Sequence, residues 1–301
     1  MPRNETRSRV INAVARPGAA PMAWTLLIVA VALAITVGAA LNHRRNTQAA
    51  AAIVAAAAAS VPATPVPAQI MEQLENVPAT AWQQAGTKDA KRPVFVGDSN
   101  SVDGKPVVLY VGVGFCPYCA AARWSMVTAL SRFGKFTGLT LANSSAVDVY
   151  PSSPTFSFYK SSYTSPYVVF ESVEQETDVP LASGRYQPLE TASPAQEALM
   201  KKYDAAPYVD ASGAGGIPFI LIGGRFMWSG SPFDPGVLAG KSQGAIAATL
   251  AQVSGSAAQP ILSNANQVTA AICAVDGGKP AEVCSDPVIQ SAIKALPNKI
   301  P

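Results

Sequence analysis

The sequence has little charge and a single histidine, and both shortages exclude classes of function. Only 14% of its 301 residues are charged and 49% are hydrophobic, which argues against a wholly disordered chain. One histidine, His43, argues against a zinc enzyme built on histidines and against a Ser–His–Asp hydrolase. Because it lies beside Arg44 at the end of an apolar run, we interpret His43 as an interfacial residue rather than a ligand.

The sequence also lacks a basic excess outside its first residues. The net charge of +3 arises within residues 1–21, which hold four arginines and one acid: Arg3, Arg7, Arg9, Arg16 and Glu5. The remaining residues contain equal numbers of basic and acidic side chains. We therefore expect no basic face large enough to bind nucleic acid.

Residues 22–41 form an uncharged apolar run that is long enough to cross the lipid bilayer as one helix. Trp24 lies near its start, as expected at a membrane interface, and arginines precede it. The positive-inside rule then makes residues 1–21 a cytoplasmic tail and places the rest outside the cytoplasm, in a single-pass protein of the cell membrane. The alternative is a cleaved signal peptide with small residues at 38–40, which would also export the domain.

Residues 42–92 are predicted to be a tether and a lead-in to the domain. An alanine-rich run favours a short helix, and the segment VPATPVPA favours an extended, semi-rigid spacer. Apolar residues then recur at Ile70, Leu74, Val77 and Trp82, which indicates a helical segment that packs on the domain.

A strand, a Cys-x-x-Cys motif and a helix follow one another in residues 105–133. Residues 107–113 are a β-branched apolar run, which is typical of a strand buried on both faces. The motif Cys-Pro-Tyr-Cys occupies residues 116–119, and residues 120–133 repeat apolar side chains at helical spacing. This order places the motif at the start of a helix.

That position suits a redox dithiol. The unpaired N–H groups and the dipole at a helix N-terminus stabilise a thiolate at Cys116, which is the expected nucleophile. Pro117 is tolerated in the first turn because its missing N–H has no helical partner there. Cys119 returns to the same side of the helix, so it can close a disulfide with Cys116 and resolve a mixed disulfide.

The motif and a second stretch, GGIPFILIGGRF at 215–226, resemble the thioredoxin superfamily. The resemblance implies an α/β thioredoxin-like fold over residues 93–255 and a cis peptide bond between Ile217 and Pro218 that faces the dithiol. Ile217 would present its backbone to a substrate chain, while Pro218 shields the cysteines. Phe115 and Tyr118 are expected to line an apolar docking surface, whereas Trp124 is expected in the core.

The sequence more closely resembles an uncharacterised family of membrane-anchored thioredoxin-like proteins of bacteria and archaea. The stretches FCPYCAAARWSMVTALSRFG (115–134), DVYPSSPTFSFY (148–159) and SSYTSPYVVFESVE (161–174) carry this resemblance. Two positions depart from thioredoxins themselves. Phe115 stands where they usually carry tryptophan, and Tyr110 stands at the position of their buried acid.

Residues 143–207 are expected to form a strand-rich insertion, with a helix over 194–206. Seven aromatic residues gather in its first half: Tyr150, Phe156, Phe158, Tyr159, Tyr163, Tyr167 and Phe170. They are interpreted as core side chains, with an exposed aromatic surface beside the dithiol as the alternative. Three acids, Glu171, Glu174 and Glu176, are interpreted as a solvated strand edge rather than an acid/base pair.

Cys273 and Cys284 are expected in a C-terminal helical extension, residues 256–301. An even cysteine count in an exported protein favours a structural disulfide between them. A second redox pair that relays electrons is the alternative. A zinc site built from all four cysteines is disfavoured because the spacing of the second pair is much longer than in zinc ribbons.

These features together predict a membrane-anchored, exported thiol–disulfide oxidoreductase that acts on protein thiols and disulfides. No metal, flavin or nucleotide motif is evident, and we expect no cofactor. The glycine-rich run 213–216 precedes a strand rather than a helix, which argues against a phosphate-binding loop. One membrane span offers no path for electrons, which favours oxidation or isomerisation with a separate redox partner over reduction. The alternative function is a tethered adaptor or chaperone module with structural disulfides.

Overall fold

The computed structural model describes residues 42, 44, 45 and 64–301. The predicted cytoplasmic tail, the membrane helix at 22–41 and most of the tether lie outside these residues. Among the described residues, no helix combines the length and apolar character needed to span a bilayer. The account below concerns the compact unit that contains residues 64–301.

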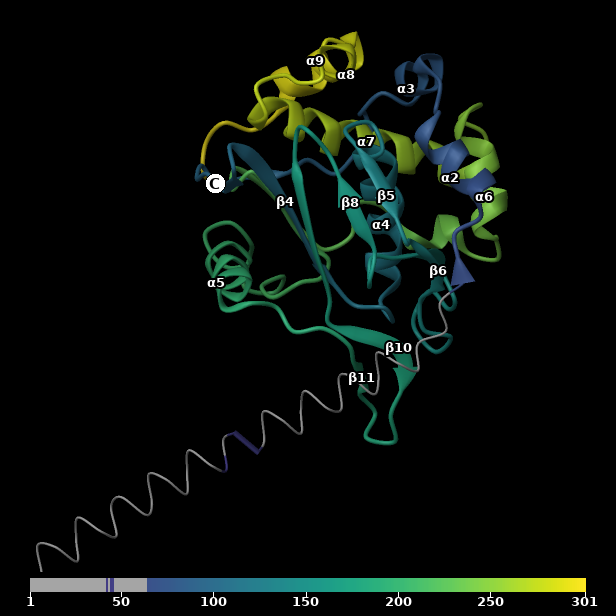
Figure 1. The fold of residues 1–301 in the computed structure, drawn as a ribbon, viewed down its shortest axis with the longest axis vertical. Helices are drawn as coiled ribbons and strands as arrows, with labels where there is room; N and C mark the ends of the chain where they lie inside the picture. The colour runs from purple at the N-terminus through teal and green to yellow at the C-terminus, as the bar shows by residue number, and fades with distance from the viewer. Residues whose placement is uncertain (1–41, 43, 46–63) are drawn as a thin grey trace, which may run out of the picture. The chain divides into compact units, whose positions relative to one another are not determined.

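The protein is a mixed α/β structure built around one central sheet (Figure 1). Its strands are β2 (Val94–Phe95), β13 (Phe226–Ser229), β12 (Phe219–Ile222), β4 (Lys105–Gly112), β3 (Ser101–Val102) and β9 (Val169–Glu174). Strand β4 is central: it pairs antiparallel with β12 and parallel with β9. Its residues 106–112 are all buried, as the apolar run in the sequence predicts.

The two faces of the sheet carry two separate cores, because side chains alternate along each strand. Val108 and Tyr110 face the larger core, which is covered by α4 (Pro117–Leu130) and α7 (Gly255–Val275). Leu109 faces the smaller core, which packs against α5 (Pro194–Tyr203). Figure 1 shows α5 on one side of β4 and α4 and α7 on the other.

The lead-in packs on the larger core. Helix α2 (Ala68–Glu75) contacts α6 (Gln243–Leu250), and α3 (Ala79–Ala85) contacts α7. The side-chain amide of Asn266 in α7 donates to the carbonyls of Trp82, at 3.0 Å, and Gly86, at 2.9 Å. The lead-in is therefore part of the folded unit.

Residues 135–188 add short strands beside the central sheet. These are β5 (Lys135–Thr137), β6 (Thr140–Asn143), β7 (Pro154–Ser157), β8 (Ser162–Thr164), β10 (Glu176–Pro180) and β11 (Tyr186–Pro188), together with β1 (Thr64–Pro65), which pairs with β6. The segment expected to be an insertion over 143–207 is thus divided. Its strand β9 belongs to the central sheet, because it is the parallel neighbour of β4, whereas the other short strands belong to small peripheral sheets of two or three strands.

The C-terminal helices complete the larger core. Helix α7 packs along α4, and fifteen of its residues are buried, so its apolar face is part of the core rather than an addition to it. The 3-10 turn η1 (Pro235–Leu238) precedes α6, and α8 (Ala281–Cys284) and α9 (Pro287–Ala295) follow α7. Cys273 and Cys284 form the expected disulfide, with their Cα atoms 5.5 Å apart.

Candidate functional site

The CPYC motif lies where β4 leads into α4. Cys116 is the N-cap of α4, and its Sγ accepts a hydrogen bond from the backbone N–H of Cys119 at 3.3 Å. Pro117 occupies the first helical position, as its sequence context predicts. Both cysteines are free thiols; Cys116 is 5% exposed and Cys119 is fully buried.

The two thiols have different acidities because their surroundings differ. The Cys119 thiol donates to Cys116 and lowers the pKa of Cys116, and the backbone N–H groups of Tyr118 and Cys119 act in the same direction against the effect of burial. Burial raises the pKa of Cys119 well above the ordinary cysteine value. Cys116 is thus the better nucleophile of the pair, and Cys119 stays protonated until Cys116 has reacted.

Two of the expected docking residues pack around these sulfurs. Phe115 and Ile217 pack against the small cluster that contains both cysteines, and the Ile217–Pro218 peptide bond is cis. The chain thus brings the segment before β12 to the N-terminus of α4, although about a hundred residues separate them in sequence. Tyr118, the aromatic residue of the motif, is 38% exposed.

The aromatic residues of the insertion divide between the core and the neighbourhood of the motif. Phe156 and Phe158 are buried in the larger core. Tyr150 instead meets Tyr118 edge to face, with ring centroids 6.0 Å apart. Outside the seven singled out from the sequence, Tyr186 in β11 stacks on Phe115 at 4.0 Å. The β10–β11 hairpin therefore lies beside the motif, and the N–H of Gly114 donates to the carbonyl of Glu176 at 2.6 Å.

Sequence reasoning missed a buried ion pair beneath the motif. Arg123 of α4 donates from Nε to Glu174 Oε1 at 2.8 Å and from Nη2 to Glu174 Oε2 at 2.5 Å, and both side chains are 1% exposed. Nη2 also donates to the carbonyl of Val113 at 2.7 Å. The interpretation of Glu174 as part of a solvated strand edge is wrong, because the end of β9 lies beneath α4. The available signal was an arginine within the apolar helix that follows the motif.

Tyr110 lies next to the buried thiol of Cys119. Its hydroxyl has no hydrogen-bond partner among the residues that the structure describes, and burial raises its pKa well above the ordinary value. A Cβ atom added at Gly112 would lie 2.3 Å from the Tyr110 hydroxyl and 3.0 Å from Cys119 Sγ. Glycine at this position therefore lets the neutral tyrosine hydroxyl and the thiol approach each other.

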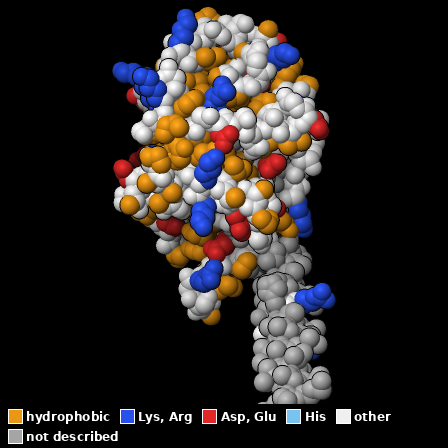
Figure 2. Space-filling model, turned by 90° about the vertical axis from the view of Figure 1, so that its left-hand side faces the viewer, with side chains coloured by type: hydrophobic (Ala, Val, Ile, Leu, Met, Phe, Trp, Pro, Cys, Tyr) orange, Lys and Arg blue, Asp and Glu red, His pale blue; other side chains and the backbone are white. Residues whose placement is uncertain are grey.

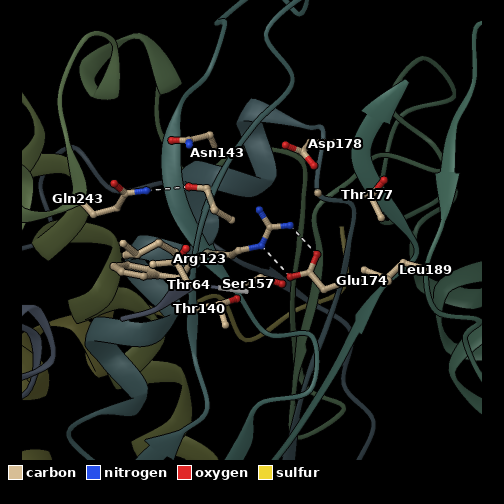
Figure 3. A pocket seen from close by; sticks show the side chains of 14 residues that line it. Thr64, Arg123, Thr140, Asn143, Ser157, Glu174, Thr177, Asp178, Leu189 and Gln243 are labelled. Atoms are coloured by element: carbon tan, nitrogen blue, oxygen red, sulfur yellow. Dashed lines mark hydrogen bonds and ion pairs between the residues drawn. The ribbon is translucent and has the colours of Figure 1, made fainter. Parts of the chain in front are cut away.

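A pocket of about 390 Å³ adjoins the motif on the side of β6 and β10. Gly114, just before the motif, forms part of its wall, and Arg123 and Glu174 also line it. Figure 3 shows these two side chains together, with the remaining guanidinium nitrogen of Arg123, Nη1, turned toward the side where Asn143 and Asp178 lie. Nη1 is buried and has no hydrogen-bond partner in the described part of the chain.

A metal site is not found among the residues that the structure describes. No group of three or more histidine, cysteine, aspartate or glutamate side chains there could hold an ion. A four-cysteine zinc site does not form, because Cys273 and Cys284 are joined to each other. On the face over α5, basic and acidic side chains are interspersed among apolar ones (Figure 2), so no charge of one sign gathers there.

The described residues thus define a mixed α/β protein with a reduced cysteine pair at a helix N-terminus. The family described as Domain of unknown function (DUF929) matches residues 95–274, and because this is more than half of the sequence, the chain belongs to that family. The matched segment includes both motif cysteines, Arg123 and Glu174. No curated protein and no solved structure matches the chain.

Proposed function

We propose that this protein is a membrane-anchored, exported thiol–disulfide oxidoreductase whose CPYC dithiol exchanges with protein substrates. One observation carries the proposal: Cys116 caps a helix and accepts a hydrogen bond from the Cys119 N–H, which helps lower its pKa, while Cys119 is buried, which raises its pKa. A purely structural pair has no need of this asymmetry, whereas thiol–disulfide exchange requires one ready nucleophile and one delayed resolving thiol.

Exchange with a substrate disulfide takes two steps. The Cys116 thiolate attacks one substrate sulfur, so that a mixed disulfide forms and the other substrate sulfur leaves as a thiolate. Cys119 then loses its proton and attacks Cys116 Sγ, which releases the second substrate thiolate and closes the Cys116–Cys119 disulfide. Two electrons pass to the substrate, and in the reverse direction the same steps oxidise a substrate dithiol.

A thioredoxin-like fold is the finer description that we propose for the α/β structure. The succession of β4, the motif and α4, the parallel pairing of β4 with β9, and the cis proline beside the dithiol support it. In this proposal Ile217 and Pro218 orient the backbone of the partner. Phe115 and the exposed edge of Tyr118 contact its side chains.

The direction of exchange follows from the anchor. A single membrane helix at 22–41 conducts no electrons, so a reductase would need a separate donor across the membrane. We therefore favour oxidation or isomerisation of exported chains, with reoxidation by a separate membrane or exported redox partner.

The second candidate function is a tethered adaptor in which Cys116 and Cys119 are structural. The burial of both sulfurs favours it, since a buried cysteine often serves packing alone. The two functions predict different effects of cysteine substitution on stability and on turnover. In the adaptor, the loss of either cysteine lowers stability. In the oxidoreductase, Cys116→Ser abolishes turnover and leaves the melting temperature nearly unchanged.

The test is thiol trapping of the purified full chain, in detergent, across a glutathione gradient. An oxidase or isomerase gives a potential near about −120 to −180 mV, and a reductase gives one near about −270 mV. A pair that resists reduction until the protein unfolds would refute the oxidoreductase. A Cys119→Ala variant expressed in cells should retain its partner as a mixed disulfide, which identifies the substrate.

A further inference from the structure

The pocket beside the motif contains a hydrogen-bond donor that no part of the described structure uses. Arg123 directs Nε and Nη2 to Glu174, and Nη2 also reaches Val113, but Nη1 has no acceptor although it is buried. Leaving a charged donor buried and unpaired is unfavourable, because its lost hydration is not replaced. An arginine held in this way by a carboxylate is rigid, so its free N–H groups are prepared for an acceptor that arrives with a ligand (Figure 3).

The charges around Nη1 decide which acceptor fits. The carboxylate of Glu174 neutralises Arg123 directly. Asp178 is the other charged residue of the described pocket wall, it is exposed, and it has no salt bridge within the described part of the chain. The wall therefore carries a net charge of one negative unit. This charge disfavours a phosphate or carboxylate ligand and favours a neutral carbonyl on Nη1, with a neutral or basic group near Asp178.

The rest of the wall favours an apolar side chain next to that carbonyl. Leu141 and Leu189 contribute apolar surface, and the backbone of Gly114 brings the pocket to the start of the motif. A volume of about 390 Å³ is at the small end of ligand pockets, which span roughly 300–1,000 Å³. It suits a few residues of an extended peptide better than a large cofactor.

We propose that this pocket is a second recognition site for the polypeptide substrate, distinct from the cis-proline segment. A backbone carbonyl of the substrate accepts from Arg123 Nη1, the neighbouring apolar side chain packs on Leu141, and a following basic residue faces Asp178. This inference rests on the proposed exchange function, since a substrate cysteine on Cys116 brings its flanking residues to the wall at Gly114.

Binding is tested without redox chemistry in the full-length Cys116→Ser protein in detergent micelles. The probes share the leucine side chain and differ in charge: N-acetyl-leucine amide is neutral, leucine amide is cationic and N-acetyl-leucine is anionic. We expect the first two to shift the NMR signals of the Arg123 side chain and the Gly114 N–H, and the anion to bind at least about threefold more weakly. Asp178→Asn should reduce this discrimination, whereas Asp210→Asn, an exposed acid that does not line the pocket, should not. Tighter binding of the anion, or no shift at these groups with any probe, would overturn the proposal.

Turnover separates this inference from the proposed function. Leu141→Trp fills the pocket, so it should raise the KM for a disulfide-linked peptide with a Leu-Lys flank at least about fivefold more than the KM for hydroxyethyl disulfide. Val102→Trp, a control at an exposed edge-strand residue, should shift the two equally. If Leu141→Trp also shifts them equally, the pocket is not a substrate site but the oxidoreductase stands. If the unmodified protein exchanges with neither disulfide, the oxidoreductase fails and the substrate site fails with it.

Discussion

At the scale of single residues, the chemistry of the site depends on a difference in acidity between two thiols that lie three positions apart in one helix turn. Cys116 precedes the helix and receives the N–H of Cys119 on its sulfur. Cys119 is inside the first turn, where the core covers it completely. The same local geometry therefore stabilises negative charge on one sulfur and disfavours it on the other.

This difference predicts the pH dependence of alkylation. Because the pKa of Cys116 is lowered, its thiolate fraction and its rate with iodoacetamide should rise with pH through a midpoint below the ordinary cysteine value. Cys119 should react slowly at every pH at which the protein stays folded, since burial raises its pKa. Mass spectrometry of the modified sites over a pH series measures both rates.

The Cys119→Ala variant is the control for the cause of the shift. It removes the thiol that donates to Cys116, so the midpoint for Cys116 should move upward. An unchanged midpoint would show that the Cys119 thiol does not set the acidity of Cys116.

The buried ion pair makes a second prediction at this scale. Arg123→Met leaves the Glu174 carboxylate buried without its partner, which should lower the free energy of unfolding by about 3–5 kcal/mol. Adding Glu174→Gln should recover a large part of the loss, because no unpaired charge then remains. Urea denaturation of the single and double variants measures these changes.

Lys135→Met is the matched control, since Lys135 pairs with Glu75 at 3.7 Å with its side chain 79% exposed. Little change is expected there, because exposed pairs contribute little. If Arg123→Met were as mild as Lys135→Met, the pair would not be held in the protein interior.

At the scale of elements, the approach of β4 to α4 depends on Gly112. Gly112→Ala places a methyl group within 3.0 Å of both the Tyr110 hydroxyl and Cys119 Sγ, and both belong to buried side chains with little room to move. We expect a loss of about 1–3 kcal/mol in the free energy of unfolding, as for other overpacked cores. Thermal denaturation measures it. Gly244→Ala in α6 is the control: its new methyl group meets only Ile70 at 3.8 Å, so stability should hold or rise.

The disulfide makes the next prediction at the element scale. Cys273 and Cys284 close a loop with a sequence separation of 11 between α7 and α8, so replacing both with alanine should cost about 3 kcal/mol of unfolding free energy. Alkylation of Cys116 should stay the same in this variant, because a structural disulfide takes no part in exchange. A changed Cys116 potential in the double variant would favour the electron relay instead.

The elements that sequence could predict are those whose signals are local. The apolar run at 107–113, the helix after the motif and the helix near 194–206 correspond to β4, α4 and α5, since periodicity and capping act over a few residues. The pairing of β9 with β4 and the contact of Arg123 with Glu174 were not predictable in this way. The two ion-pair residues lie 51 positions apart, and nothing near either one specifies the other.

At the scale of the whole molecule, the folded unit extends beyond the family match. The match begins at residue 95, yet α2 and α3 bury Ile70, Leu74 and Trp82 in the same core as α4 and α7. The carbonyls at the end of α3 also satisfy the buried amide of Asn266. The lead-in therefore covers an apolar surface of the domain that its removal would expose to water.

This dependence gives the last prediction. A chain that starts at residue 93 loses three large buried side chains, each of which contributes about 1.5–3 kcal/mol, from a domain whose total stability is on the order of 5–15 kcal/mol. It should lack a cooperative thermal transition, whereas a chain that starts at residue 64 should keep one. Trp82→Ala in the longer chain is the intermediate case, with a loss of about 3–5 kcal/mol. Calorimetry compares the three proteins, and equal cooperativity in the two truncated chains would show that the family region folds without its lead-in, so that α2 and α3 serve the tether instead of the core.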